Sequence, residues 1–241
     1  MNPSQSAHPS TFLTAAESSP DARAAFVRRT YVHLAIAILG FVGVEAWLLK
    51  SPLAEPLISL MLGHRFSWLV VLGCFMGISM LANGMAQARG SIGKQYSGLA
   101  LLVVAYAVLF LPLISYAIYF TQSAEIVTTA GIITLMLVAG LTATVFITRA
   151  DFSFMANILT IGGLIAIGLI VCGMIFGFSL GLWFSVLMVG FAAGAILYET
   201  SNILHRYGTD DHVAASLGLF ASVALLFWYI LQILLSFANR E

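Results

Sequence analysis

A carboxylate followed by polar side chains is the group in this sequence best suited to chemistry. Glu199 lies in an otherwise apolar stretch, and the polar residues 200–202 follow it directly. Ionisable side chains inside membrane-spanning segments cost at least about 2.5 kcal/mol each, and they commonly mark ion or proton pathways. A Glu199 carboxyl group facing the interior of a helix bundle could change charge with the pH of the adjoining compartment. The competing interpretation is a side chain that extends to the membrane surface, where water solvates its charge.

Two further ionisable residues lie near the ends of the first apolar stretch. Glu45 is about one turn from its far end, so we expect this side chain to reach the membrane surface. His33 lies near the beginning of the same stretch and could titrate near neutral pH. A histidine held by structural hydrogen bonds is the more common outcome, and we expect it here.

The segment between the last two apolar stretches carries His205, Asp210, Asp211 and His212. These side chains could bind a metal, but their spacing matches no standard metal site. Carboxylates suit the positive end of the helix dipole, so we expect Asp210 or Asp211 to cap the last helix instead. The HExxH and phosphate-loop motifs of common enzymes are missing from the sequence. We therefore predict neither an enzyme nor a bound metal or cofactor.

The composition requires that lipid cover most of the surface. Only 8% of the 241 residues are charged and 61% are apolar, whereas a soluble domain carries about 25% charged residues. The formal net charge is zero, and without a basic run the sequence gives no indication of nucleic-acid binding. The partner that the composition does predict is the lipid bilayer.

Seven apolar stretches are long enough to cross this bilayer as helices. A span needs about 20 residues, because the hydrocarbon is about 30 Å thick and each helical residue rises about 1.5 Å. Three pairs of glycines in these stretches are four residues apart, a spacing that lets helices approach closely: Gly73/Gly77, Gly173/Gly177 and Gly190/Gly194. We predict an all-α integral membrane protein, a bundle of seven transmembrane helices at residues 31–49, 66–86, 96–120, 126–148, 154–176, 181–204 and 213–238.

The lysine and arginine residues predict the orientation of these spans. Seven of them would lie on the side of the N-terminus and three on the opposite side. Because positive residues favour the cytoplasmic side, we expect a cytoplasmic N-terminus and, with seven spans, a C-terminus on the far side.

The first 26 residues differ in composition from the rest of the chain. They are polar, rich in Ser, Ala and Pro, and contain no apolar segment typical of a signal peptide. We predict a disordered cytoplasmic tail at residues 1–26, followed by the membrane domain at residues 27–241. Such a tail could be gripped by a protein partner, and the candidate contacts around its end are Asp21, Arg23, Arg28 and Arg29.

Four short motifs occur in an order that is characteristic of one family. They are Arg29-Thr30-Tyr31 at the first span, Leu111-Pro112 in the third, residues 148–154 before the fifth, and residues 195–203, which read AILYETSNI, in the sixth. In these motifs the chain resembles the Bax inhibitor-1 family, and more closely its bacterial YccA branch. The resemblance extends from about residue 28 to the C-terminus.

The resemblance implies a fold, a location and two activities. The fold is a bundle of seven helices with the last helix at its centre, in a bacterial inner membrane with a periplasmic C-terminus. One activity is association with a membrane-anchored FtsH-type AAA protease, which is thereby inhibited. The other is a pH-sensitive leak of calcium, or of protons, controlled by an intramembrane carboxylate.

The residues that the resemblance assigns to the leak fall on Glu199, Arg89 and Ser222. Glu199 keeps the carboxylate of the family's first aspartate, and Arg89 stands for an arginine at the end of the second helix. Ser222 replaces the second aspartate, and a serine cannot share a proton with Glu199 as a second carboxylate would. We therefore rank modulation of the protease above the leak.

Overall fold

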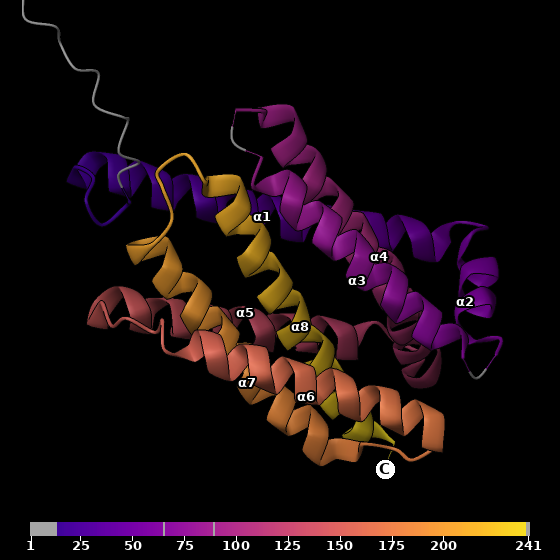
Figure 1. The fold of residues 1–241 in the computed structure, drawn as a ribbon. Coiled ribbons are helices and arrows are strands. Elements are labelled where there is room, and N and C mark those ends of the chain that lie inside the picture. Colours follow the sequence, from indigo (N-terminus) through magenta and orange to yellow (C-terminus); the bar gives the residue numbers. More distant parts are fainter. Residues whose placement is uncertain (1–13, 65, 89, 240–241) are drawn as a thin grey trace, which may run out of the picture.

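The computed structural model describes residues 14–239 except Arg65 and Arg89. Eight α-helices form in this part of the chain (Figure 1). They are α1 (Pro20–Lys50), α2 (Ala54–Leu62), α3 (Ser67–Ala86), α4 (Ile92–Thr121), α5 (Glu125–Thr148), α6 (Met155–Phe176), α7 (Gly181–His205) and α8 (His212–Ala238). Seven of them, all except the short α2, are long and apolar enough to cross a membrane. The predicted all-α membrane fold is confirmed.

The helices form a bundle with two distinct ends. Helices α1, α4, α6 and α8 begin at the end where the described chain starts, which we call the N-terminal end (Figure 1). Helices α3, α5 and α7 begin at the opposite end, where α8 finishes, and we call this the C-terminal end. The loop between α7 and α8 therefore lies at the N-terminal end, and α2 lies at the C-terminal end.

Helix α1 begins earlier than the sequence predicts. Its first residue is Pro20, and the Ser19 side chain caps it by accepting a hydrogen bond from the Ala22 amide at 3.4 Å. Proline fits the first turn of a helix, where its missing N–H has no partner to lose. Phe26 is buried in the core, so the last part of the predicted disordered tail is an ordered helix. Residues 1–13 of that tail lie outside the described residues.

Helix α8 lies at the centre of the bundle. In its apolar window 61% of the residues are buried, against 6% in α6. It packs against α1, α3, α4, α5 and α7, and Figure 1 shows it crossing the middle of the bundle. Its aromatic side chains interlock with neighbouring helices, for example Phe227 stacked on Phe110 of α4 with ring centres 5.6 Å apart. The central position of the last helix agrees with the family resemblance.

A glycine allows α3 and α4 to pack closely together. A Cβ atom at Gly98 would lie 2.6 Å from the carbonyl oxygen of Ala82 and 2.9 Å from the amide nitrogen of Ala86. Added Cβ atoms at Gly73 and Gly77 would meet no described atom within 4 Å. Of the three predicted glycine pairs, Gly73/Gly77 therefore marks no close contact among the described residues, whereas an added Cβ at Gly194 of α7 would lie 2.7 Å from the methyl group of Met155 on α6. The close approach of α3 and α4 occurs at Gly98, outside these pairs.

Glu45 is buried, which contradicts the expectation that it reaches the membrane surface. It belongs to the stripe of α1 that faces the core, with Phe41 and Leu48 one turn away on either side. Its side chain is 4% exposed, and neither carboxyl oxygen has a hydrogen-bond partner among the described residues. The stripe determines this burial, because a helix turns all the residues at this spacing toward the same neighbours.

Candidate functional site

Glu199 lies in the seam between α7 and α8, near the N-terminal end of the bundle. Its carboxylate rests against the backbone of α8 at Gly218, where an added Cβ atom would lie 3.0 Å from Oε2 of Glu199. A side chain at position 218 would occupy the place of this carboxylate. Glycine at this position therefore gives the carboxylate its room between the two helices.

Tyr207, in the loop between α7 and α8, lies above this carboxylate. Its hydroxyl donates toward Oε2 of Glu199 at 3.5 Å, which is the long limit of a hydrogen bond. Burial raises the pKa of Tyr207, and the neighbouring carboxylate raises it further. Tyr207 thus stays protonated over the physiological pH range and remains a donor to Glu199.

Ser222 lies on the same seam, one turn further along α8. It is buried, and its hydroxyl donates to the carbonyl oxygen of Gly218 at 3.2 Å. Ser222 thus lies one turn along α8 from the glycine that the Glu199 carboxylate contacts, and its hydroxyl is bonded to the backbone. Arg89, the third residue that the resemblance assigns, lies outside the described residues.

Residues 14–18, which we call the N-terminal strap, hold the loop that carries Tyr207. Thr14 pairs with Gly208 as an isolated β-bridge, and the Ala15 amide donates to the carbonyl oxygen of Tyr207 at 2.8 Å. Ala15 is fully buried in this contact. The strap therefore fixes the backbone of Tyr207, and through it the donor above Glu199.

The four charged candidates around the tail have different surroundings. The Arg23 guanidinium donates from Nε to the carbonyl oxygen of Ala15 at 2.7 Å and from an Nη to that of Ala16. Arg23 therefore stabilises the strap. Asp21, Arg28 and Arg29 have exposed side chains on α1, and a partner could reach them at the N-terminal end.

The acidic residues of the α7–α8 loop have a structural role that differs from the predicted one. Asp211 is the N-cap residue of α8, but no side-chain capping hydrogen bond forms there. Its carboxylate instead accepts from the Gly208 amide at 3.2 Å, so it stabilises the loop on which the strap docks. Among the described residues, no group of three His, Cys, Asp or Glu side chains could hold a metal ion.

His33 has the structural role expected for it. Its Nδ1 lies 2.7 Å from the carbonyl oxygen of Arg29, and its Nε2 lies 2.7 Å from the hydroxyl of Tyr96 on α4. A carbonyl can only accept, so Nδ1 donates to Arg29. The hydrogen bond between Nε2 and the Tyr96 hydroxyl joins α1 to α4 at the N-terminal end.

Sequence reasoning missed three parts of this site, namely Gly218, Tyr207 and the strap. Gly218 shows no signal beyond its residue type, because its importance depends on which side of α8 meets Glu199. The strap contacts a loop more than 190 positions later in the chain, and no local pattern predicts such a pairing. The early start of α1 did have a signal, since Ser19, Pro20 and Asp21 are the residue types favoured at a helix N-terminus.

Comparisons with known proteins match the chain over most of its length. The family model described as inhibitor of apoptosis-promoting Bax1 matches residues 23–239. A protein named Bax inhibitor 1 from Schizosaccharomyces pombe is 29% identical over 233 residues, which are 94% of this chain and 82% of that protein. No solved structure is a significant match.

Two bacterial proteins match shorter parts of the chain. An uncharacterized protein of Pseudomonas aeruginosa is 32% identical over 123 residues, 51% of this chain and 55% of that protein. An Escherichia coli protein named modulator of FtsH protease YccA is 35% identical over 104 residues, 41% of this chain and 45% of that protein. The chain thus spans about half the length of these two relatives.

Proposed function

Because this chain belongs to the Bax inhibitor-1 family, we propose that it modulates a membrane-anchored AAA protease of the FtsH type by associating with it in the bilayer. The observation that carries the proposal is the similarity to the Escherichia coli protein named modulator of FtsH protease YccA. In this proposal the protein lies in a bacterial inner membrane, with the N-terminal end of the bundle in the cytoplasm. The related protein named inner membrane protein YccA supports that location.

The N-terminal end of the bundle offers the surface on which a partner would act. Asp21, Arg28 and Arg29 are exposed there, and the strap lies there. A partner that binds at this end would meet charged side chains next to the loop that covers Glu199. The proposed function is therefore a binding function, with no chemical step assigned to the chain.

Co-purification tests the association directly. We expect the affinity-tagged protein, extracted from membranes in mild detergent, to bring down the AAA protease. A tagged multi-helix membrane protein of another family, expressed at the same level, should not. Recovery of equal amounts of protease with both proteins, or of none with either, would reject the proposal.

Two nested deletions separate the tail from the strap. Removing residues 2–13 leaves the strap intact, so we expect unchanged thermal unfolding. If the protease grips the tail, the same deletion should lengthen the protein's lifetime in pulse-chase experiments.

Removing residues 2–18 also takes away the strap, whose backbone contacts with the α7–α8 loop are worth about 1–3 kcal/mol. Only this longer deletion should lower the thermal midpoint. A gain in lifetime that requires the longer deletion would show that the protease grips the strap, and not the tail.

A second candidate function is a pH-sensitive leak of calcium or protons. The position of the Glu199 carboxylate between α7 and α8, beside the central helix, favours it, and Ser222 in place of a second carboxylate opposes it. We expect calcium flux near background from the unmodified protein in proteoliposomes at any pH, and no change with Glu199→Gln. Robust flux that is modulated by acid and abolished by Glu199→Gln would make the leak the primary function. In that case Ser222→Asp should sharpen the pH dependence, because two close carboxylates titrate in separate steps.

A further inference from the structure

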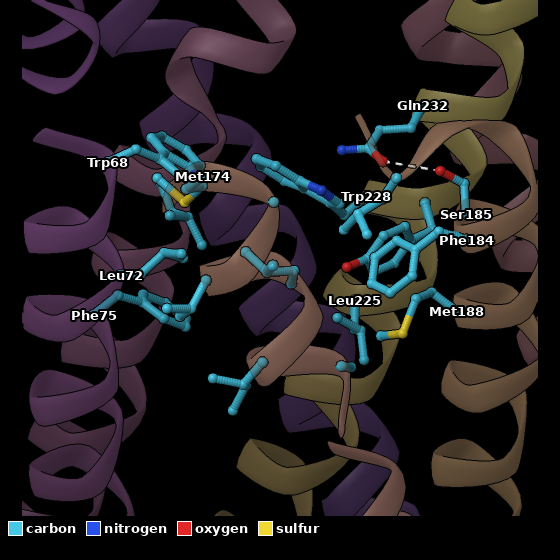
Figure 2. A pocket seen from close by; sticks show the side chains of 18 of the residues that line it. Trp68, Leu72, Phe75, Met174, Phe184, Ser185, Met188, Leu225, Trp228 and Gln232 are labelled. Carbon is cyan, nitrogen blue, oxygen red and sulfur yellow. Dashed lines mark hydrogen bonds between the residues drawn. The ribbon is translucent and has the colours of Figure 1, made fainter. Parts of the chain in front are cut away.

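A cavity of about 760 Å³ lies in the C-terminal half of the bundle. Its walls come from α3, α4, α6, α7 and α8, as Figure 2 shows for a set of the side chains that line it. The volume falls within the range of about 300–1,000 Å³ that is typical of small-molecule sites. The cavity is separate from the Glu199 site, because its lining includes residues near the start of α3 and α7 and near the end of α8, all at the other end of the bundle.

Aromatic rings in fixed contacts form much of the wall. Trp68 of α3 stacks on Trp228 of α8 with ring centres 6.2 Å apart, and Phe110 of α4 meets the same Trp228 edge-on at 4.8 Å. On the far side, Phe184 of α7 packs edge-on against Tyr229 at 5.9 Å. None of the described side chains that line the cavity is charged. An occupant must therefore be apolar over most of its length.

A few polar groups gather at one place in the largely apolar cavity wall. Ser185 donates to Oε1 of Gln232 at 3.1 Å, and both residues line the cavity. Because the amide oxygen is used in this bond, the amide nitrogen of Gln232 is turned away from Ser185, on the side of Trp228 in Figure 2. This nitrogen and the indole N–H of Trp228 are hydrogen-bond donors. They suit an occupant that carries an uncharged acceptor.

The rim of the cavity faces the surroundings of the bundle between α3 and α6. Met76 of α3 and Ile167 of α6 both line the cavity and are also exposed on the outside, by 46% and 42%. Both lie within spans whose outer faces are apolar. At this depth the medium outside the bundle is the hydrocarbon of the membrane.

We propose that the cavity binds one acyl chain of a membrane phospholipid, which enters between α3 and α6. The chain lies against the stacked tryptophans, and its ester carbonyl accepts from the donors of Gln232 and Trp228. The headgroup stays in the membrane interface, since no charged side chain inside the described cavity would pair with it. This lipid would fill the space between α3 and α6 and join the two helices.

Quenching of tryptophan fluorescence by brominated acyl chains tests this proposal, because bromine quenches on contact. The chain has four tryptophans. Replacing Trp47 and Trp183, which lie outside the lining, by Phe leaves Trp68 and Trp228 of the cavity wall as the reporters. We expect lower fluorescence from these two tryptophans in phosphatidylethanolamine–phosphatidylglycerol vesicles with dibrominated acyl chains than in the same vesicles without bromine. Equal fluorescence in the two vesicles would overturn the proposal.

Cavity-filling variants distinguish a chain inside the cavity from lipid outside the bundle. Gly73 lines the cavity, and a Cβ atom there meets no described atom within 4 Å, so Gly73→Leu should fill the space and remove the quenching. Gly77→Leu, one turn along α3 and equally open but outside the lining, is the matched control and should keep it. If Gly73→Leu fails to fold, Gly163→Leu fills the cavity from α6, where the added Cβ would make only an ordinary contact of 3.6 Å with Phe191.

One further result would overturn the proposal. Quenching that persists in both filled variants would come from lipid outside the bundle.

Discussion

Replacing Gly98 by alanine is expected to lower the free energy of unfolding by about 1–3 kcal/mol, the range for overfilling a packed interior. The added Cβ atom would lie 2.6 Å from the carbonyl oxygen of Ala82 and 2.9 Å from the amide nitrogen of Ala86. Both of these are backbone atoms of α3, so no side chain can rotate away to relieve the overlap. The two helices would have to separate, and the loss of packing would extend along the α3–α4 contact. Gly98→Leu should prevent the bundle from assembling.

Gly93→Ala is the matched control for this substitution. Gly93 lies in the first turn of the same helix, and an added Cβ there meets no described atom within 4 Å. Because alanine is a better helix former than glycine, this variant should be as stable as the parent or slightly more stable. Thermal unfolding in detergent micelles measures both variants. Equal midpoints for Gly98→Ala and Gly93→Ala would contradict the close contact between α3 and α4.

Replacing Glu45 by leucine is expected to stabilise the protein by about 1–3 kcal/mol, the usual cost of a buried polar group without a partner. The carboxyl group lies on the core-facing stripe of α1 between Phe41 and Leu48, and both of its oxygens lack a partner among the described residues. Leucine has a similar size and carries no group that needs a hydrogen bond. The effect should appear as a higher thermal midpoint in the same detergent.

Glu55→Leu provides the comparison, because Glu55 is an exposed glutamate on α2. Removing a solvated surface charge should leave the thermal midpoint within the small range typical of surface substitutions, about 0.5 kcal/mol. If Glu45→Leu destabilised the protein, the carboxyl group would have a binding partner in the native state. A Glu45→Leu variant that is more stable but no longer co-purifies with the protease would show that the carboxyl group, although it destabilises the fold, is needed for association with the protease.

The sequence predicts the spans well because the physical requirement for them is local. A run of about 20 apolar residues is sufficient for a transmembrane helix, and α3 to α8 begin and end within a few residues of the predicted ranges. Which residues of a span contact a neighbouring helix depends on how the helices pack together. The residue type alone does not predict these contacts. Gly73 and Gly98 are both glycines in spans, yet only Gly98 meets a backbone closely.

The candidate site was predictable only where its features are visible in the local sequence. Glu199 stands out because it is a carboxylate within an apolar run, and the resemblance adds Ser222. The contact of the Glu199 carboxylate with Gly218 depends on the packing of α7 on α8. The burial of Glu45 could have been read from the sequence, because it falls in step with Phe26, Leu34 and Phe41 on one face of α1. Its closeness to the end of the span favoured the opposite interpretation.

The central position of α8 has a consequence for biosynthesis. The helix that α1, α3, α4, α5 and α7 pack against is synthesised after all five of them. Between the end of α7 at His205 and the end of α8 at Ala238, synthesis at about 5–20 residues per second takes roughly two to seven seconds. During this interval the five helices lack their common partner, and their core-facing surfaces are open to chaperones and to quality-control proteases. A ribosome that stalls within α8 would leave these helices in the membrane without the centre of their core.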